Sequence, residues 1–173
     1  RLELLEVLPP GFLGGSLAEI VTMAEATFQP PPTRFEAGTG PVAQAIGWAA
    51  AVGYLGHLGM DRLAAHERVL TARLLAGVAA VDGVRVLGPA TARGRTGAVS
   101  LDIDGVHPHD AGQFLDEAGV AVRVGHHCAQ PIHRAFGVAA STRASLGVYN
   151  TVAEVDRFVE VLGDVRGYFG VGR

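Results

Sequence analysis

The only cysteine of the chain lies in the stretch RVGHHCAQP, residues 123–131, directly after two histidines. A lone cysteine is most often a small buried hydrophobic residue. Here the neighbours include Arg123, His126 and His127, and polar residues of this kind are typical of an exposed loop. Because positive charge favours the nucleophilic thiolate, we predict that Cys128 is reactive and that His126 or His127 assists proton movement or favours the thiolate.

Two other chemistries compete for this stretch. A metal site would combine His126, His127, Cys128, His107 and His109. Adjacent histidines on an extended segment point to opposite faces, and neither CxxC nor HExxH spacing is present, so we expect no intrinsic metal site. A hydrolase-type Cys/His pair needs a separate base and an oxyanion hole, and directly adjacent histidines are poorly placed to be that base.

Arg143, in the strand-like run STRASLGVY, allows two interpretations. It is either an arginine at the edge of a sheet with its head in water, or a guanidinium fork aimed at a carboxylate. The pattern leaves both open. The same holds for Arg123, which precedes the cysteine by five residues.

These residues need elements to position them, and hydrophobic periodicity predicts an α+β lobe. The predicted elements are helix 60–81, strands 84–89 and 96–103, a helix from near Asp110 to Gly119, strand 120–125, a short helix, strand 141–149 and helix 151–169. We expect Asp61 to cap the first helix, Gly83 to follow its end and Thr151 to cap the last helix. The strands should form a small mixed or antiparallel sheet that helices cover.

The N-terminal region has a different character. Residues 1–40 are rich in Pro and Gly and predict long surface loops, which need a larger body to lie on. Within them RFEAGT, residues 34–39, is a turn before a predicted helix, where Thr39 is either part of a phosphate site or a helix cap. Residues 42–60 are small and apolar almost all round, which predicts a buried helix.

Composition excludes several classes of protein. An apolar fraction of 49% with 18% charged residues is typical of a soluble globular protein, and a net charge of −3 leaves no basic surface for nucleic acid. No apolar run approaches the roughly 20 residues of a membrane-spanning helix, and the N-terminus lacks the sections of a signal peptide. One cysteine forms no internal disulfide, so a reducing cytoplasm is expected. All 14 Lys+Arg residues are arginines, so no lysine can form a Schiff base.

Three segments together resemble one family. RFEAGT, DEAGVAVRVGHHCAQP and RASLGVYNT, in this order and at these separations, resemble the C-terminal part of the SufS-type (group II) cysteine desulfurases. These are pyridoxal-phosphate (PLP) enzymes of aminotransferase class V and fold type I. The resemblance covers nearly the whole chain. It implies conversion of L-cysteine to L-alanine, with a persulfide left on a cysteine for iron–sulfur cluster assembly.

The resemblance implies a role for each matching residue. Cys128 is expected to attack the substrate sulfur and hold the persulfide, and Arg143 to pair with the substrate carboxylate. Arg123 matches a second active-site arginine. Thr39 matches a threonine that reaches across a homodimer to the partner's PLP phosphate, although this chain continues AGTGPV where relatives commonly have AGTPN. His109 matches a histidine that binds the zinc of a SufU-type partner during sulfur transfer; a solvated histidine at a helix start is the other interpretation.

The resemblance also accounts for the missing lysine, since the family's Schiff-base lysine lies upstream of the matching region. Residues 1–56 are expected to form the end of the PLP-binding large domain with a connecting helix, and residues 57–173 the small C-terminal domain. The chain is then a fragment that lacks the N-terminal portion and is inactive alone. Its expected partners are L-cysteine, a second subunit and a SufU-type or SufE-type sulfur acceptor. Two alternatives stay open: a non-enzymatic module that carries persulfide on Cys128 and docks a scaffold, and a selenocysteine lyase-like relative.

Overall fold

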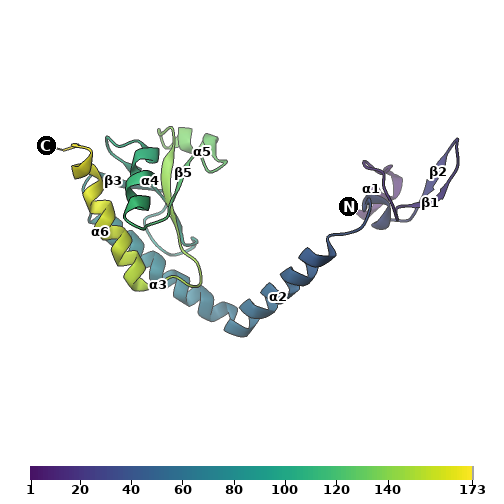
Figure 1. The fold of residues 1–173 in the computed structure, drawn as a ribbon, viewed down its shortest axis with the longest axis horizontal. Helices are drawn as coiled ribbons and strands as arrows, with labels where there is room; N and C mark the ends of the chain where they lie inside the picture. The colour runs from purple at the N-terminus through teal and green to yellow at the C-terminus, as the bar shows by residue number, and fades with distance from the viewer. Residues whose placement is uncertain (173) are drawn as a thin grey trace. The chain divides into compact units, whose positions relative to one another are not determined.

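A computed structural model describes residues 1–172, which divide into two units, residues 1–57 and residues from 58 onward (Figure 1). The second unit is built on a four-stranded sheet. Its strands are β3 (Val84–Leu87), β4 (Ala98–Ile103), β5 (Arg123–Gly125) and β6 (Ser141–Ser145), in the order β3-β4-β6-β5. Every neighbouring pair is antiparallel, so the expectation of a small mixed or antiparallel sheet is confirmed in its antiparallel form.

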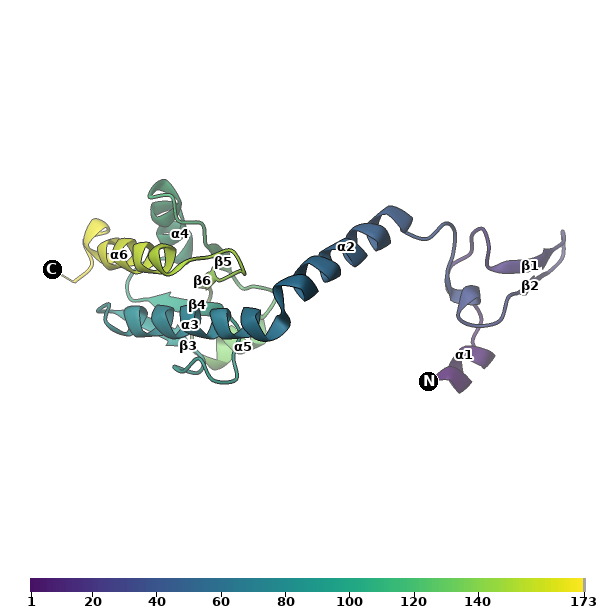
Figure 2. The same ribbon diagram turned by 90° about the horizontal axis from the view of Figure 1, so that it is seen from below.

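One face of this sheet packs on helices. The helices that contribute buried apolar side chains are α3 (Met60–Ala79), α4 (Pro108–Glu117) and α6 (Val152–Tyr168), and α3 and α6 lie side by side in Figures 1 and 2. They form one core with the inward side chains of β4, among them Val99, Leu101 and Ile103. Because side chains alternate along a strand, the residues between these three point to the opposite face. That second face carries the polar residues discussed below.

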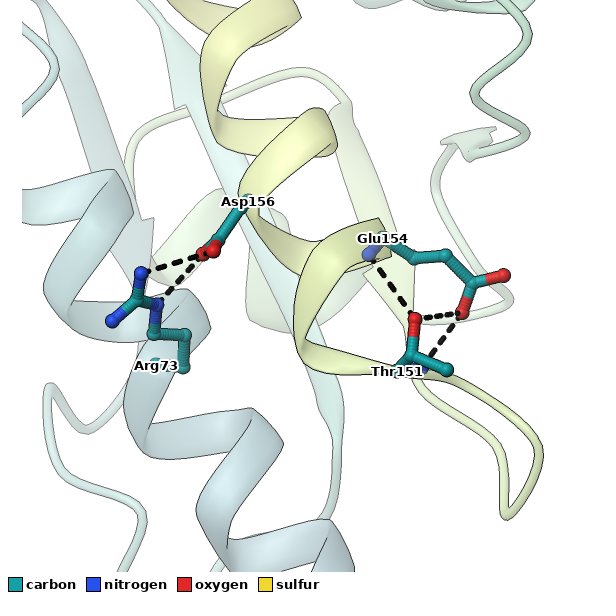
Figure 3. Close-up of polar contacts among 4 residues, drawn as sticks. All are labelled: Arg73, Thr151, Glu154 and Asp156. Carbon is teal, nitrogen blue, oxygen red and sulfur yellow. Dashed lines mark hydrogen bonds and ion pairs between the residues drawn. The ribbon is translucent and has the colours of Figure 1, made fainter.

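Helix α6 begins with the cap that its sequence predicts. The Thr151 hydroxyl accepts from the Glu154 amide at 3.3 Å, and the Thr151 amide donates to the Glu154 carboxylate at 2.7 Å (Figure 3). This reciprocal pair satisfies two amides that a helix start leaves without partners. The same helix is joined to α3 by an exposed ion pair, in which Arg73 Nε lies 2.7 Å from Asp156 Oδ1.

Several predicted boundaries shift in the structure. Helix α4 begins at Pro108, before the predicted Asp110, because proline fits the first helical position and the His107 side chain accepts from the amide of His109. Strands β5 and β6 are shorter than predicted, and the expected short helix is α5 (Gln130–Ala135). Asp61 lies in the first turn of α3, but the cap position is Gly59 and has no side-chain hydrogen bond.

The first unit consists mainly of loops. Its elements are α1 (Leu2–Val7), the antiparallel hairpin β1 (Ala18–Val21) and β2 (Ala26–Phe28), the 3-10 turn η1 (Thr33–Phe35) and α2 (Val42–Leu58), whose last residue belongs to the second unit. Helix α2 was expected to be buried, and this is wrong for the described chain: none of its residues is buried and Trp48 is 75% exposed. No described element covers its apolar side chains.

Membrane-spanning helices were also sought. Within residues 1–172, no helix combines the length and the apolar character that crossing a membrane requires.

Candidate functional site

Arg143 and Arg123 lie on the sheet face that points away from the helical core. Arg143 belongs to β6, which lies between β4 and β5, and its neighbours Thr142 and Ala144 are buried on the other face. The sheet-edge interpretation of Arg143 is therefore wrong, because β6 is an interior strand. Arg143 pairs directly with Arg123 on β5 and with Ser100 on β4.

The two guanidinium groups have no anionic partner among the described residues, whose ion pairs all involve other arginines. The Nε of Arg143 is buried and makes no hydrogen bond. Leaving a buried charged donor unpaired is costly, and like charges directly opposite on paired strands repel each other. Both costs fall when an anion binds, and a planar carboxylate matches the fork of an arginine. The arrangement is therefore one that a planar anion such as a carboxylate would suit.

Cys128 lies at the tip of a tight turn that follows β5. The turn is closed by the Ala129 amide, which donates to the His126 carbonyl at 2.8 Å. Both central residues have left-handed backbone, with φ of 53° at His127 and 57° at Cys128. Such a conformation costs of order 1–3 kcal/mol for a residue other than glycine. The Cys128 thiol is exposed and free, as the sequence predicts for a reactive cysteine.

A chain of hydrogen bonds supports this turn. His133, on α5, has Nδ1 2.9 Å from the Ala129 carbonyl and Nε2 2.9 Å from the Ser141 hydroxyl. The same hydroxyl lies 3.1 Å from Nε2 of His127. We call His127, Ser141, His133 and the Ala129 carbonyl the His–Ser clamp.

Sequence reasoning missed Ser141 and His133. The one available signal was spacing, since a short helix starting after Ala129 brings a side chain four residues later back toward that carbonyl. Both residues are buried, with exposures of 0% and 4%.

The charge state of His127 follows from its surroundings. Burial is the largest cause that lowers its pKa below the usual value, followed by the charge of Arg143. A hydrogen bond with the Ser141 backbone opposes the shift in pKa, and His133 and Arg123 add to the shift. The Nδ1 atom is buried without a hydrogen-bond partner, which also disfavours a second ring proton. These surroundings therefore favour the neutral form of His127.

The other predicted histidines occupy exposed positions. His126 is exposed, and the ring of His133 lies edge-on to it with centroids 6.2 Å apart. His109 is exposed at the start of α4, and its ring stacks on that of His107 with centroids 5.4 Å apart. Within the described chain, no three His, Cys, Asp or Glu side chains gather closely enough to hold a metal ion.

Thr39 lies in the first unit, on the loop between η1 and α2. It is exposed, and its hydroxyl makes no hydrogen bond within residues 1–172, so the helix-cap interpretation of this threonine finds no support. The loop lines a depression together with Ser16, Thr33 and Gly38, the last of which has a φ of 84°. A free hydroxyl between glycines can approach an oxyanion closely.

Comparison with known proteins defines the class of this chain. The family model for aminotransferase class V matches residues 1–158, so the chain belongs to this family. It is 53% identical over 170 residues to the probable cysteine desulfurase 2 of Mycobacterium leprae, covering 98% of this chain and 41% of that protein. It is 50% identical over 170 residues to the probable cysteine desulfurase of Streptomyces coelicolor, with the same shares of 98% and 41%. The chain thus spans about two fifths of the length of the curated relatives that it matches.

Solved structures show the same relationship. The cysteine desulfurase of Thermococcus onnurineus NA1, in its apo form, matches with a TM-score of 0.88 and 36% identity over 96% of this chain and 42% of that one. The cysteine desulfurase CsdA of Escherichia coli matches with a TM-score of 0.86 and 32% identity over 97% of this chain and 41% of that one. The predicted α+β fold of an aminotransferase-like, PLP fold type I enzyme is confirmed.

Proposed function

We propose that this chain is the C-terminal part of a SufS-type, PLP-dependent cysteine desulfurase. One observation carries the proposal: an exposed thiol lies on a strained turn directly after β5, and β5 and β6 hold two arginines that have no anionic partner among the described residues. The names of the relatives support cysteine as the substrate. The complete enzyme would convert L-cysteine to L-alanine and leave a persulfide on Cys128 for iron–sulfur cluster assembly.

Arg143 and Arg123 bind the substrate carboxylate in this proposal. The buried Nε of Arg143 gains the partner that it lacks, and the repulsion between the two guanidinium groups is offset. Fixing the carboxylate in this way orients the rest of the amino acid. Orientation contributes strongly to rate, because it replaces a search through many unproductive positions.

Cys128 is the sulfur acceptor. Its thiolate attacks the sulfur of L-cysteine, forming the S–S bond while the bond between Cβ and sulfur breaks and its electron pair stays with Cβ. A proton then reaches Cβ, so that L-cysteine and the Cys128 thiol give L-alanine and a Cys128 persulfide. Pyridoxal phosphate, when bound, supplies the electron sink that makes this carbon–sulfur bond breakable. The exposed tip of the turn leaves Cys128 accessible to substrate and to a later acceptor.

The residues present fit only the phosphate end of that cofactor. Thr39 offers a free hydroxyl in a depression lined by Gly38 and Gly40, which suits a phosphate oxygen. No lysine is available in this chain, so the Schiff-base lysine belongs to the portion of the enzyme that the chain does not include. Residues 1–56 would then belong to the large, cofactor-binding domain and residues 57–173 to the small domain.

The proposal extends to partners. Exposed apolar side chains on α2, such as Ile46, Trp48 and Tyr54, form a surface that the rest of the enzyme or a second subunit of a homodimer would cover. His109 is exposed at the start of α4, where it can reach the zinc of a SufU-type acceptor; a SufE-type acceptor would not need it. The cytoplasm is the compartment where a free thiol of this kind persists.

Alanine release by the complete gene product with PLP tests this function. Arg143→Gln should raise the KM for L-cysteine at least about tenfold, since a charge-assisted hydrogen bond contributes about 1.5–3 kcal/mol. Arg134→Gln is the matched control, because Arg134 is exposed on α5, and it should leave KM unchanged. No alanine from wild type would favour the persulfide-carrier alternative, and consumption of selenocysteine alone would favour a lyase-like relative.

A further inference from the structure

The His–Ser clamp holds the two residues on either side of Cys128 in the turn. His127 is the second residue of that turn and Ala129 is the fourth, and each is tied to the Ser141 hydroxyl, the latter through the ring of His133. Ser141 belongs to β6, in the rigid interior of the sheet. The clamp therefore fixes the turn to the same strand that holds Arg143.

The chemistry of each partner sets the direction of the hydrogen bonds. A backbone carbonyl only accepts, so His133 Nδ1 carries a proton and donates it to Ala129. When the His133 ring is neutral, its other nitrogen, Nε2, accepts, and the single hydroxyl proton of Ser141 points to it. The Ser141 oxygen is then left as an acceptor for the Nε2–H of His127. One tautomer of His127 results, with the proton on Nε2 and none on Nδ1.

This tautomer suits the surroundings of His127. Its Nδ1 is buried without a partner, and a second ring proton would be disfavoured by burial and by the charges of Arg143 on β6 and Arg123 on β5. The neutral ring of His127 is thus held in place by its hydrogen bond to Ser141. Of the two histidines beside the cysteine, His126 is exposed and His127 is partly buried.

We propose that Ser141 and His133 are positioning residues, which act through His127 and Ala129 to hold the strained turn and so aim the Cys128 thiol. The proposal rests on the proposed function for its kinetic consequence, but not for the clamp itself. A relaxed turn would release His127 and Cys128 from left-handed backbone and displace the sulfur. A displacement of about 1 Å at a reacting group is enough to slow a reaction about a hundredfold.

The test uses the complete gene product with Ser141→Ala, which removes both hydrogen bonds to the hydroxyl. Ser145→Ala is the control on the same strand, since Ser145 is exposed, and Ser141→Thr retains a hydroxyl. Ring 15N chemical shifts report which nitrogen of His127 carries the proton. We expect the Nε2–H tautomer in wild type, Ser145→Ala and Ser141→Thr, and a mixture of tautomers in Ser141→Ala. An unchanged tautomer in Ser141→Ala overturns the proposal.

Kinetics provide the second measurement. Persulfide formation on Cys128 should slow at least about tenfold in Ser141→Ala, with the KM for L-cysteine unchanged and the rate recovered in Ser141→Thr. An unchanged rate, or a rise in KM alone, contradicts a positioning role. If wild type forms no persulfide, the proposed function fails, whereas the tautomer and the rate of Cys128 alkylation by iodoacetamide in Ser141→Ala still decide whether the clamp positions the thiol.

Discussion

Arg123 and Arg143 face each other across the pairing of β5 with β6, although they carry the same charge. Neither has a carboxylate partner among residues 1–172. The two cations repel each other in the folded chain, and an anion bound between them would offset this repulsion. This pair is the observation on which the proposed carboxylate site rests.

Arg123→Gln is expected to stabilise the chain. Removing one of two like charges on paired strands should raise the free energy of unfolding by about 0.2–1 kcal/mol at low ionic strength. The gain should shrink at about 1 M salt, where charges are screened within about 3 Å. Urea unfolding at both salt concentrations measures it, and a gain that salt does not change would rule out electrostatic repulsion as its cause.

The left-handed backbone at Cys128 should reverse the usual order of stability of alanine and glycine variants. Cys128→Gly should be more stable than Cys128→Ala by about 1 kcal/mol, because glycine adopts a φ of 57° without the steric cost that alanine retains. Urea unfolding of the two variants gives the difference. At Gly163, in the middle of α6, the usual order should hold: the Gly163→Ala variant should be more stable than the protein with glycine. Equal stability of the two Cys128 variants would mean that the turn is not strained.

His127 makes stability depend on pH. Its folded pKa is lowered by burial and by Arg143, so the unfolded chain binds the proton at a higher pH than the folded chain does. The stability contributed by the neutral ring is complete above the unfolded pKa of about 6.5 and is lost as the pH falls toward the folded pKa. His127→Gln should flatten this part of a stability–pH curve. His109→Gln, at an exposed position, should leave it in place, and a curve that His127→Gln does not alter would contradict the assignment.

Helices α3 and α6 pack closely at Gly77. A Cβ at this position would lie 2.6 Å from Cγ2 of Val159, a stiff branched side chain that cannot move away freely. Gly77→Ala should therefore destabilise the chain by about 1–3 kcal/mol despite the better helix propensity of alanine. Gly163→Ala is the control, since no atom outside the helix lies within 4 Å of its added Cβ. Adding Val159→Ala to Gly77→Ala should restore most of the loss in thermal unfolding.

Local rules predicted much of this fold. Thr151 with Glu154 gives a capping box, and alternating apolar residues give the strands that become β3 and β4. Boundaries moved where one residue outweighed the pattern, as Pro108 did at the start of α4. The exposure of α2 was not predictable from its apolar sequence, because burial depends on what lies against a helix as well as on its own residues.

The site was predictable only in part. Cys128 stood out by its neighbours, and its exposure is confirmed. The sequence left Arg143 undecided, since the order of strands in a sheet decides whether β6 is an edge, and that order depends on long-range pairing. Ser141 and His133 carry no motif, and their bond exists only because α5 folds back onto β6. Proton positions on histidines likewise follow from tertiary partners.

The most direct test of the account is the mass of the complete gene product after brief exposure to L-cysteine in the presence of PLP. The account predicts a gain of one sulfur atom, localised by peptide mapping to Cys128, removed by a thiol reductant and absent in Cys128→Ser. A protein that releases alanine without gaining sulfur at Cys128, or that gains it equally in Cys128→Ser, would contradict the assignment of this cysteine as the sulfur acceptor.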